Sequence, residues 1–182
     1  MEAIRFVDQS LGQAQLRLAA SCAGLTDSEA RWRPGAESNC ISFLLWHLSR
    51  VEDRLASAEL GVETLWAGEG WHARFGNDVE TPSVLGDRQS ALGVALPELS
   101  LLLAYQLAAA ARTRALVEGL TSEELDRPSL AMRGMQLADA LRHLATHKNN
   151  HHGQIDFLRG LQQDDWDLPP GTGVRLPETT AD

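Results

Sequence analysis

Four long stretches of the chain carry apolar residues at intervals of three and four, and no stretch alternates polar and apolar residues over the length of a strand. Leu and Ala dominate, whereas Ile and aromatic residues, which favour strands, are few. An apolar stripe at this spacing lies on one face of a helix and is buried against other helices. The sequence therefore predicts an all-α protein.

Local signals set the ends of the expected helices, which cover roughly residues 3–23, 41–60, 97–118 and 135–161. Gly24 closes the first helix, Asn39 can cap the second, and Pro97 suits the first turn of the third. Between the second and third helices, residues 61–96 break the helical pattern with six glycines and Pro82. Four helices with one long crossover between the second and third predict a four-helix bundle.

A short motif occurs twice, each time after a long helix and before a helix that carries histidine. Residues 24–29 (GLTDSE) match residues 119–124 (GLTSEE) in Gly, Leu, Thr and Glu. In each copy the Thr hydroxyl can accept from the backbone N–H of the Glu while the Glu carboxylate reaches back, which is a capping box. The repetition favours two similar helix pairs.

The length of the chain indicates one domain, and its net charge argues against one class of partner. The 182 residues fit one domain, with the bundle over residues 1–161 and an extended or mobile tail, rich in Pro and Gly, over residues 162–182. The 16 Lys and Arg against 25 Asp and Glu give a formal charge of −9, and no basic run occurs. Nucleic acid is therefore not an expected partner, because phosphate binding depends on clustered basic residues.

The N-terminal segment and the cysteines indicate the compartment. The first twenty residues mix charged with apolar positions, which is typical of neither a signal peptide nor a membrane span. Cys22 and Cys40 have no CxxC spacing and are too few for a disulfide scaffold. We expect a cytoplasmic protein without a membrane association, in which both cysteines are structural.

Histidines are concentrated in the last predicted helix, where His143, His147, His151 and His152 fall within ten residues. Imidazoles four residues apart project from one helical face and can share a cation. At about 100° per residue, among the histidines spaced four apart, His151 and His147 point closer to the apolar face than His143, which points furthest aside. The inward pair is therefore His147 and His151.

A third ligand has to come from another helix, and His47 lies within the apolar stripe of the second one. Three neutral imidazoles leave coordination positions open on a divalent ion, as in a catalytic site. Zn, Ni, Fe and Mn all accept such ligands. A histidine on an apolar face is also often a hydrogen-bonded core residue, so a non-catalytic bundle stays an alternative. Lys148 shares the inward face, which predicts that its ammonium reaches out through a wider opening.

Other residues are weaker candidates for the site. Arg50 and Arg54 could hold an anionic substrate group, although surface pairing with acidic residues is the favoured role. Gln154 and Glu52 could orient the imidazoles or be solvated. Four side chains of the crossover could form a lid or substrate wall, although packing on the bundle is favoured; they are Trp66, Trp71, His72 and Phe75.

Two sequence elements resemble the DinB-like (YfiT-like) metalloenzyme superfamily, which includes thiol-dependent transferases and isomerases. These elements are WHL at residues 46–48, followed by Glu52, and HLATHKNNHHGQI at residues 143–155. The resemblance covers roughly residues 3–161 and implies a four-helix bundle with a long connection between helices two and three. It also implies one metal ligand from helix two and two from helix four.

Carried over residue by residue, the implied ligands are His47, His147 and His151. The chain departs from the family at two positions. Thiol-using members often carry Glu at the position of His147, and many members carry Arg at the position of His152. The family's habit, together with the Leu- and Ala-rich third helix, predicts a homodimer.

The open metal site supports two kinds of chemistry on a small-molecule substrate. It could deprotonate a low-molecular-weight thiol for attack on an electrophile, or lower the pKa of water for hydrolysis. The resemblance favours a thiol-dependent S-transferase or isomerase. A metal-dependent hydrolase and a non-catalytic metal-binding bundle are the alternatives.

Overall fold

The computed structural model describes residues 3–85, 87–168 and 172. Within these residues all regular structure is helical, apart from one isolated bridge between Pro128 and Gln136. The prediction of an all-α protein is thus confirmed. The four long helices are α1 (Ala3–Cys22), α3 (Ile41–Leu60), α7 (Leu99–Glu118) and α8 (Leu137–Gly160). The short elements are α2 (Asp27–Arg31), α4 (Leu65–Gly68), α5 (Trp71–Phe75), α6 (Arg88–Gly93) and the 3-10 turn η1 (Glu123–Asp126).

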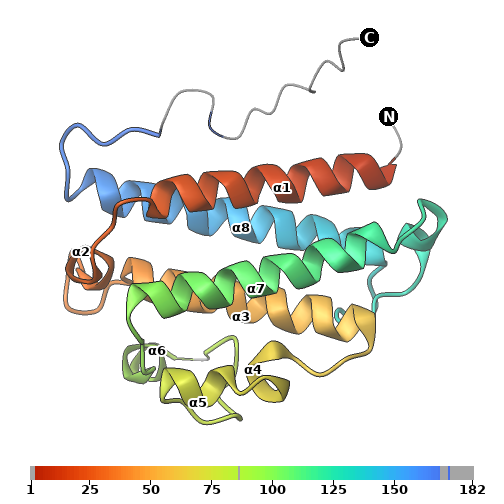
Figure 1. The fold of residues 1–182 in the computed structure, drawn as a ribbon, viewed down its shortest axis with the longest axis horizontal. Coiled ribbons are helices and arrows are strands. Elements are labelled where there is room, and N and C mark those ends of the chain that lie inside the picture. Colours follow the sequence, from red (N-terminus) through yellow and green to blue (C-terminus); the bar gives the residue numbers. More distant parts are fainter. Residues whose placement is uncertain (1–2, 86, 169–171, 173–182) are drawn as a thin grey trace.

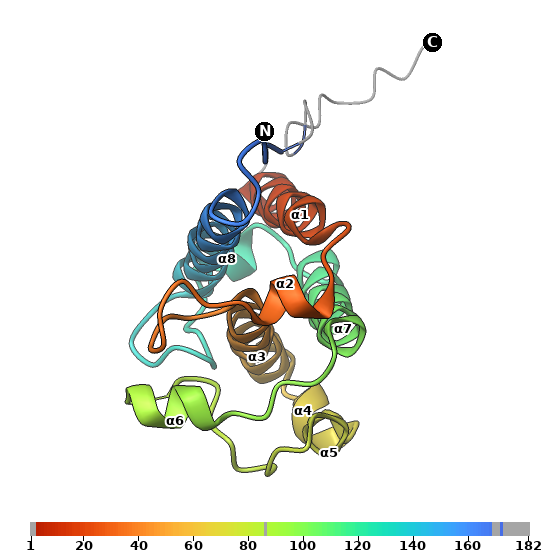
Figure 2. The same ribbon diagram turned by 90° about the vertical axis from the view of Figure 1, so that its left-hand side faces the viewer.

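The four long helices lie side by side, with α1 against α8 and α3 against α7 (Figure 1). Helix α3 also packs against α8, which brings the helix of His47 into contact with the helix that carries four histidines. The crossover between α3 and α7 carries α4, α5 and α6 on the side of α3 that faces away from α1 (Figure 2).

Aromatic side chains fasten the crossover to the long helices. Trp66 of α4 is fully buried and packs edge-on against Trp46 of α3, with ring centroids 6.4 Å apart. Trp71 and Phe75 of α5 lie against Tyr105 of α7, with ring centroids 5.1 and 5.5 Å away. The crossover aromatics therefore pack onto the bundle, which is the role that the sequence favoured for them.

The start of α7 differs from the prediction. The helix begins at Leu99 and not at Pro97, and its first backbone N–H donates to a carboxylate oxygen of Asp27 on α2, 2.6 Å away. Arg31 of α2 donates to the carbonyls of Leu96 and Pro97 just before the helix. The cap comes from another element, so no signal next to the helix could reveal it.

Two other helix starts also differ from expectation. The N-cap of α3 is Cys40 and not Asn39, and its side chain makes no capping hydrogen bond. Helix α8 begins at Leu137, two residues later than predicted, where Gln136 and Asp139 form a capping box. Differences of this size are usual at helix ends, where the backbone hydrogen bonds are incomplete.

The two copies of the repeated motif fold differently. The first forms a full capping box, in which the Thr26 side chain accepts from the Glu29 N–H and the Glu29 carboxylate accepts from the Thr26 N–H. In the second, the Glu124 carboxylate accepts from the Thr121 N–H, but the turn that follows is the 3-10 element η1. The repeated motif thus forms the same hydrogen bond between Glu and Thr in both copies, but one copy begins an α-helix and the other a 3-10 helix.

The predicted tail lies partly outside the described residues, since residues 169–171 and 173–182 are not described. Residues 162–168 turn back on the end of α8, where the Arg159 guanidinium lies 3.7 Å from the ring centre of Trp166. In the described part of the chain, no helix combines the length and apolarity that crossing a membrane requires.

Candidate metal centre

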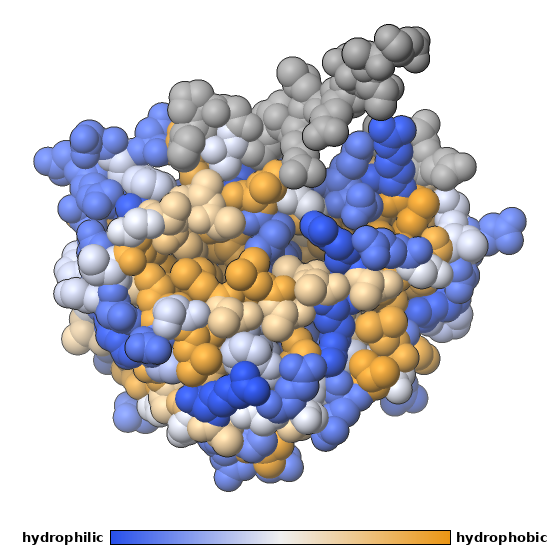
Figure 3. Space-filling model, viewed as in Figure 1, coloured by the Kyte–Doolittle hydropathy of each residue, from blue (hydrophilic) through white to orange (hydrophobic). Residues whose placement is uncertain are grey.

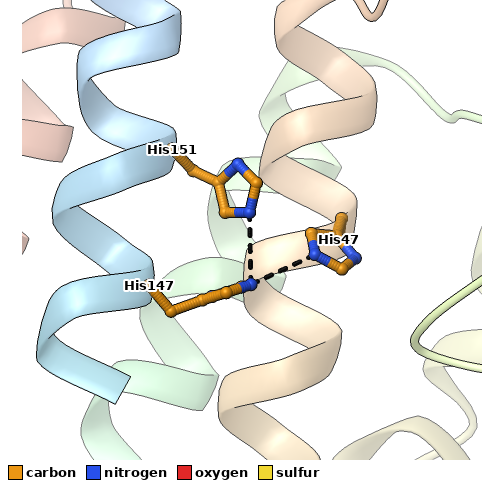
Figure 4. A group of neighbouring side chains, drawn as sticks. All are labelled: His47, His147 and His151. Carbon is orange, nitrogen blue, oxygen red and sulfur yellow. Dashed lines mark hydrogen bonds between the residues drawn. The ribbon is translucent and has the colours of Figure 1, made fainter. Parts of the chain in front are cut away.

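Three imidazoles from two helices point at one another between α3 and α8 (Figure 4). The Nε2 atom of His147 lies 3.1 Å from the Nε2 of His47 and 3.1 Å from the Nε2 of His151. One ring nitrogen from each residue lies within 4.8 Å of the other two. The structure therefore brings together the three histidines that the sequence singled out.

Helical geometry explains which histidines meet. His147 and His151 are one turn apart on α8, so their rings lie on the same face of the helix, edge to face, with centroids 4.4 Å apart. His47 reaches this face from α3. His143 is exposed, as its angle on the helix predicted, and His152 is buried on another face beside Asp156, 3.0 Å away. His72 of α5 lies outside the cluster and bonds the Trp66 carbonyl.

Hydrogen bonds on the far side of two rings set their tautomers. The Nδ1 of His47 lies 3.0 Å from the Ser83 carbonyl oxygen, and the Nδ1 of His151 lies 2.8 Å from Oε1 of Gln154. Because both partners accept, each Nδ1 carries the proton in the neutral ring. Each Nε2 then presents a lone pair to the Nε2 of His147.

At the centre of the cluster, the Nε2 of His147 faces two hydrogen-bond acceptors, the Nε2 atoms of His47 and His151. The Nδ1 of His147 is buried and has no hydrogen-bond partner among the residues that the structure describes. A proton on its Nε2 could satisfy only one of the two facing lone pairs, and a proton on Nδ1 would leave three lone pairs converging. A cation satisfies all three.

The distances fit such a cation. Two imidazole nitrogens that each lie about 2.0–2.1 Å from one ion, at angles of about 90–110°, are roughly 2.8–3.4 Å apart. Both Nε2 separations from His147 are 3.1 Å, within this range. The donor set is three imidazoles, which suits Zn, Ni, Fe or Mn.

The surroundings keep the three imidazoles neutral. Burial lowers the pKa of His147 to about 3, and the neighbouring His151, His47 and His143 add to the shift. Burial also lowers the pKa of His47 and of His151, although in both rings the hydrogen bond on Nδ1 opposes the shift. Near neutral pH all three imidazoles are therefore neutral, and each has a ring nitrogen without a proton that can bind a metal.

Arg50 lies deeper than the sequence suggested, since it is buried and does not pair at the surface. Its guanidinium lies 4.0 Å from the ring centre of Trp66 and donates to the Thr81 carbonyl, 2.7 Å away. Thr81 is two residues from Ser83, whose carbonyl accepts from His47. Arg50 thus holds the crossover segment that orients a candidate ligand. Arg54 is exposed.

Two further expectations for residues near the site were wrong. The Lys148 ammonium is buried and does not reach an opening, because it lies 2.8 Å from both carboxylate oxygens of Glu52. Glu52 is itself 1% exposed, so it neither orients the imidazoles nor faces solvent. Oε1 of Gln15 accepts a third hydrogen bond from the ammonium. Gln154, in contrast, does orient His151.

Sequence reasoning missed Asp53, a fully buried carboxylate on α3. It accepts from the backbone N–H groups of Leu65 and Trp66 at the start of α4 and from the Tyr105 hydroxyl, at 2.8 to 3.0 Å. Asp53 therefore ties the crossover to α3 and α7. The one available signal was its spacing, seven residues after Trp46 and so on the same buried face.

Both cysteines are free and buried, and they are expected to be unreactive in the native protein. Burial, opposed by Arg159, raises the pKa of the Cys22 thiol to about 12, which leaves roughly one thiolate in ten thousand molecules at pH 8. Titration with a disulfide reagent at pH 8 should detect no thiol in the native protein and two in urea. Fast native reaction at either cysteine would contradict the packing.

Comparison with known proteins agrees with the resemblance. A sequence model of the DinB superfamily matches residues 10–155, which include all three histidines. The crystal structure of a conserved protein from Enterococcus faecalis is similar, with a TM-score of 0.76 and 23% sequence identity over 88% of this chain and 97% of that chain. At this identity the likeness shows the fold. A search of curated protein sequences finds no match.

Proposed function

The chain belongs to the DinB superfamily, and on this premise we propose that His47, His147 and His151 bind one divalent metal ion at which a small-molecule substrate reacts. The observation that carries the proposal is the convergence of three imidazole nitrogens from two helices. Two of them are hydrogen-bond acceptors that face the Nε2 of His147, which could donate to only one of them. A cation at the centre would satisfy all three lone pairs.

The chain supplies neutral ligands and a fixed geometry. A divalent ion, when bound, provides a positive charge that lowers the pKa of a thiol or a water molecule beside it. The three imidazoles carry no charge of their own, so they do not cancel that charge. Ser83 and Gln154 hold the outer two rings in place, and three protein ligands leave room for a substrate.

Within this framework the reaction we propose is the transfer of a thiol to an electrophile, or a thiol-dependent isomerisation. The thiol comes from a low-molecular-weight cosubstrate, because both cysteines of the chain are buried. Free cysteines also fit a reducing compartment, and we place the protein in the cytoplasm. The substrate is a small molecule, and the ion is Zn, Ni, Fe or Mn.

A metal and activity measurement on protein purified without a His tag tests the proposal. Elemental analysis should find about one divalent ion per chain. The loaded protein should accelerate attack of a small thiol on a chlorobimane, in which a C–S bond forms, the C–Cl bond breaks, and chloride and the thiol proton leave. Chelation of the ion should remove this rate.

The same measurement separates the alternatives. Ester or amide hydrolysis with the same metal dependence, but without added thiol, would favour a metal-dependent hydrolase. Stoichiometric metal with neither activity over a broad panel of thiols and esters would favour the non-catalytic metal-binding bundle. Absence of bound metal would contradict the proposed site.

We also propose that the chain forms a homodimer through α7. The face shown in Figure 3 carries apolar residues across its middle, over α7, and Leu107 of this helix is 59% exposed. A helix with apolar residues on its outer side gains stability from covering them.

Light scattering at micromolar concentration should give twice the 19.9 kDa mass of one chain. The Leu107→Glu variant should give the mass of one chain, because the new charge would be buried at the interface. The Leu130→Glu variant, at an exposed apolar position outside α7, is the control and should stay dimeric. A single-chain mass for the wild-type protein would contradict the dimer.

A further inference from the structure

Four polar side chains, one from each long helix, meet inside the bundle. The Lys148 ammonium on α8 lies 2.8 Å from both carboxylate oxygens of Glu52 on α3 and 2.9 Å from Oε1 of Gln15 on α1. The side-chain amides of Gln15 and of Gln106 on α7 donate to each other, over 2.8 and 2.6 Å. We call these four residues the polar layer.

The polar layer divides the apolar core of the bundle. On α3, Glu52 stands between Leu48 and Leu55, which belong to different clusters of buried apolar residues. Members of the same two clusters flank the layer on the other helices; they are Leu11 and Leu18 on α1, Leu116 and Leu99 on α7, and Leu144 and Ile155 on α8. The polar layer thus crosses the bundle with apolar packing on both sides.

A polar layer of this kind restricts how helices slide and turn against one another. Apolar side chains pack against alternative neighbours at little cost, whereas a buried ammonium needs an acceptor at hydrogen-bond distance. If α8 moved along α3 by one turn, about 5.4 Å, the Lys148 ammonium and the Glu52 carboxylate would lose their hydrogen bonds while they remained in the core. One buried polar residue can set the register of a coiled coil for the same reason.

The same two helices carry the metal ligands. Lys148 follows His147 directly on α8, and Glu52 follows His47 by five residues on α3, or roughly 7.5 Å along the helix axis. The ion pair and the histidine cluster are therefore neighbouring contacts between α3 and α8. A shift of α8 that breaks the ion pair also changes the 3.1 Å between the Nε2 atoms of His47 and His147.

We propose that Glu52 and Lys148 are positioning residues, which hold α3 and α8 so that the three imidazole nitrogens lie at metal-binding distance. This inference rests on the proposed function and adds two residues that act on its metal centre through the helices. A metal site binds well when its ligands are held within about 0.5 Å of their places in the complex. Loss of groups that hold ligands in place typically weakens metal binding 10–100-fold.

A variant that keeps stability but removes the polar contact tests the proposal. In Glu52→Leu with Lys148→Met both charges become apolar, so the urea midpoint of the chelator-treated protein should be close to the wild-type value. Its zinc affinity, measured against a chromophoric chelator, should fall at least about tenfold, because apolar packing allows α8 other positions. Cobalt(II) bound in place of zinc should show altered visible bands, which report the ligand geometry.

Gln106→Met is the matched control. Gln106 belongs to the polar layer but lies on α7, which carries no histidine, and the change leaves the pair of Lys148 and Glu52 in place. It removes the hydrogen bonds to the Gln15 amide, so the urea midpoint should fall. The zinc affinity and the cobalt bands should match those of the wild-type protein, because α3 and α8 keep their contact.

Two single substitutions of Glu52 separate its reach from its charge. Glu52→Asp keeps the charge but withdraws the carboxylate by one methylene, so the helices must shift to keep the hydrogen bonds, and the cobalt bands should change. Glu52→Gln keeps the length, and its Oε1 accepts from the Lys148 ammonium, so the cobalt bands should match those of the wild-type protein. The urea midpoint of Glu52→Gln should fall, because the ammonium loses its counter-charge.

The outcomes separate this inference from the proposed function. Wild-type zinc affinity and cobalt bands in the double variant, or in Glu52→Asp if the double variant does not fold, would overturn the positioning role and leave the metal centre intact. Altered bands in Glu52→Gln, or a tenfold loss of zinc affinity in Gln106→Met, would also overturn it, because charge or stability would then control metal binding. Failure of the wild-type protein to bind zinc would overturn the proposed function, and this inference with it.

Discussion

Replacing His147 with Ala is expected to weaken zinc binding by a factor of roughly 10²–10³. Structural zinc sites, which have four protein ligands, bind with a total of about 10–16 kcal/mol, so each ligand contributes on the order of 2.5–4 kcal/mol. His147 is the central residue, since its Nε2 lies 3.1 Å from both other Nε2 atoms. Competition with a chromophoric chelator measures the affinity. The His47→Ala and His151→Ala variants should lose most of their metal as well.

Two histidines outside the cluster serve as controls. His143 is one turn before His147 but exposed, and His72 lies on α5, where its Nδ1 bonds the Trp66 carbonyl. The His143→Ala and His72→Ala variants should keep the wild-type affinity. Full metal content in the His47→Ala variant would contradict a site built from two helices.

Replacing Glu52 with Ala is expected to lower the free energy of unfolding by about 3–5 kcal/mol. The Lys148 ammonium and the Glu52 carboxylate are each 1% exposed and lie 2.8 Å apart. Removing the carboxylate leaves a charged ammonium in the core with Gln15 as its remaining hydrogen-bond partner. Urea denaturation of the chelator-treated protein measures the change, and chelation keeps metal binding from contributing to it.

A double variant and a surface variant test whether the loss of stability comes from the buried charge of Lys148. In Glu52→Leu with Lys148→Met both charges are replaced by apolar groups, so most of the lost stability should return. Arg142 forms an exposed pair with Asp139, and Arg142→Ala should change stability by less than about 1 kcal/mol. A Glu52→Ala effect as small as that of Arg142→Ala would show that the ammonium finds another partner or loses its proton.

Local sequence rules were sufficient for much of the fold. The spans of the long helices follow from apolar spacing, because the period of a helix is a property of the backbone and needs no partner. For the same reason, the pairing of His147 with His151 could be predicted from their separation of four residues. The exposure of His143 followed from the same angles. These conclusions depend on residues within a few turns of one another.

Contacts between distant residues could not be predicted in this way. The start of α7 depends on Asp27, which is 72 residues before Leu99. The burial of Lys148 depends on Glu52, which is 96 residues away. Read separately, a lysine on an inward face predicts an ammonium at an opening, and a glutamate near a histidine suggests a ligand partner. The packing of α3 on α8 brings the two charges together and changes both roles.

The sequence by itself determined the all-α class, the long helices and the histidines that face inward, because helical periodicity relates residue spacing directly to direction. The sequence offered His47 as the third ligand, but only the tertiary structure decided how closely it approaches His147 and His151, and that Ser83 and Gln154 set two tautomers. The physical reason is that these features depend on the relative positions of separate helices and of the crossover. Those positions result from packing over the whole chain, so they cannot be predicted from any single segment.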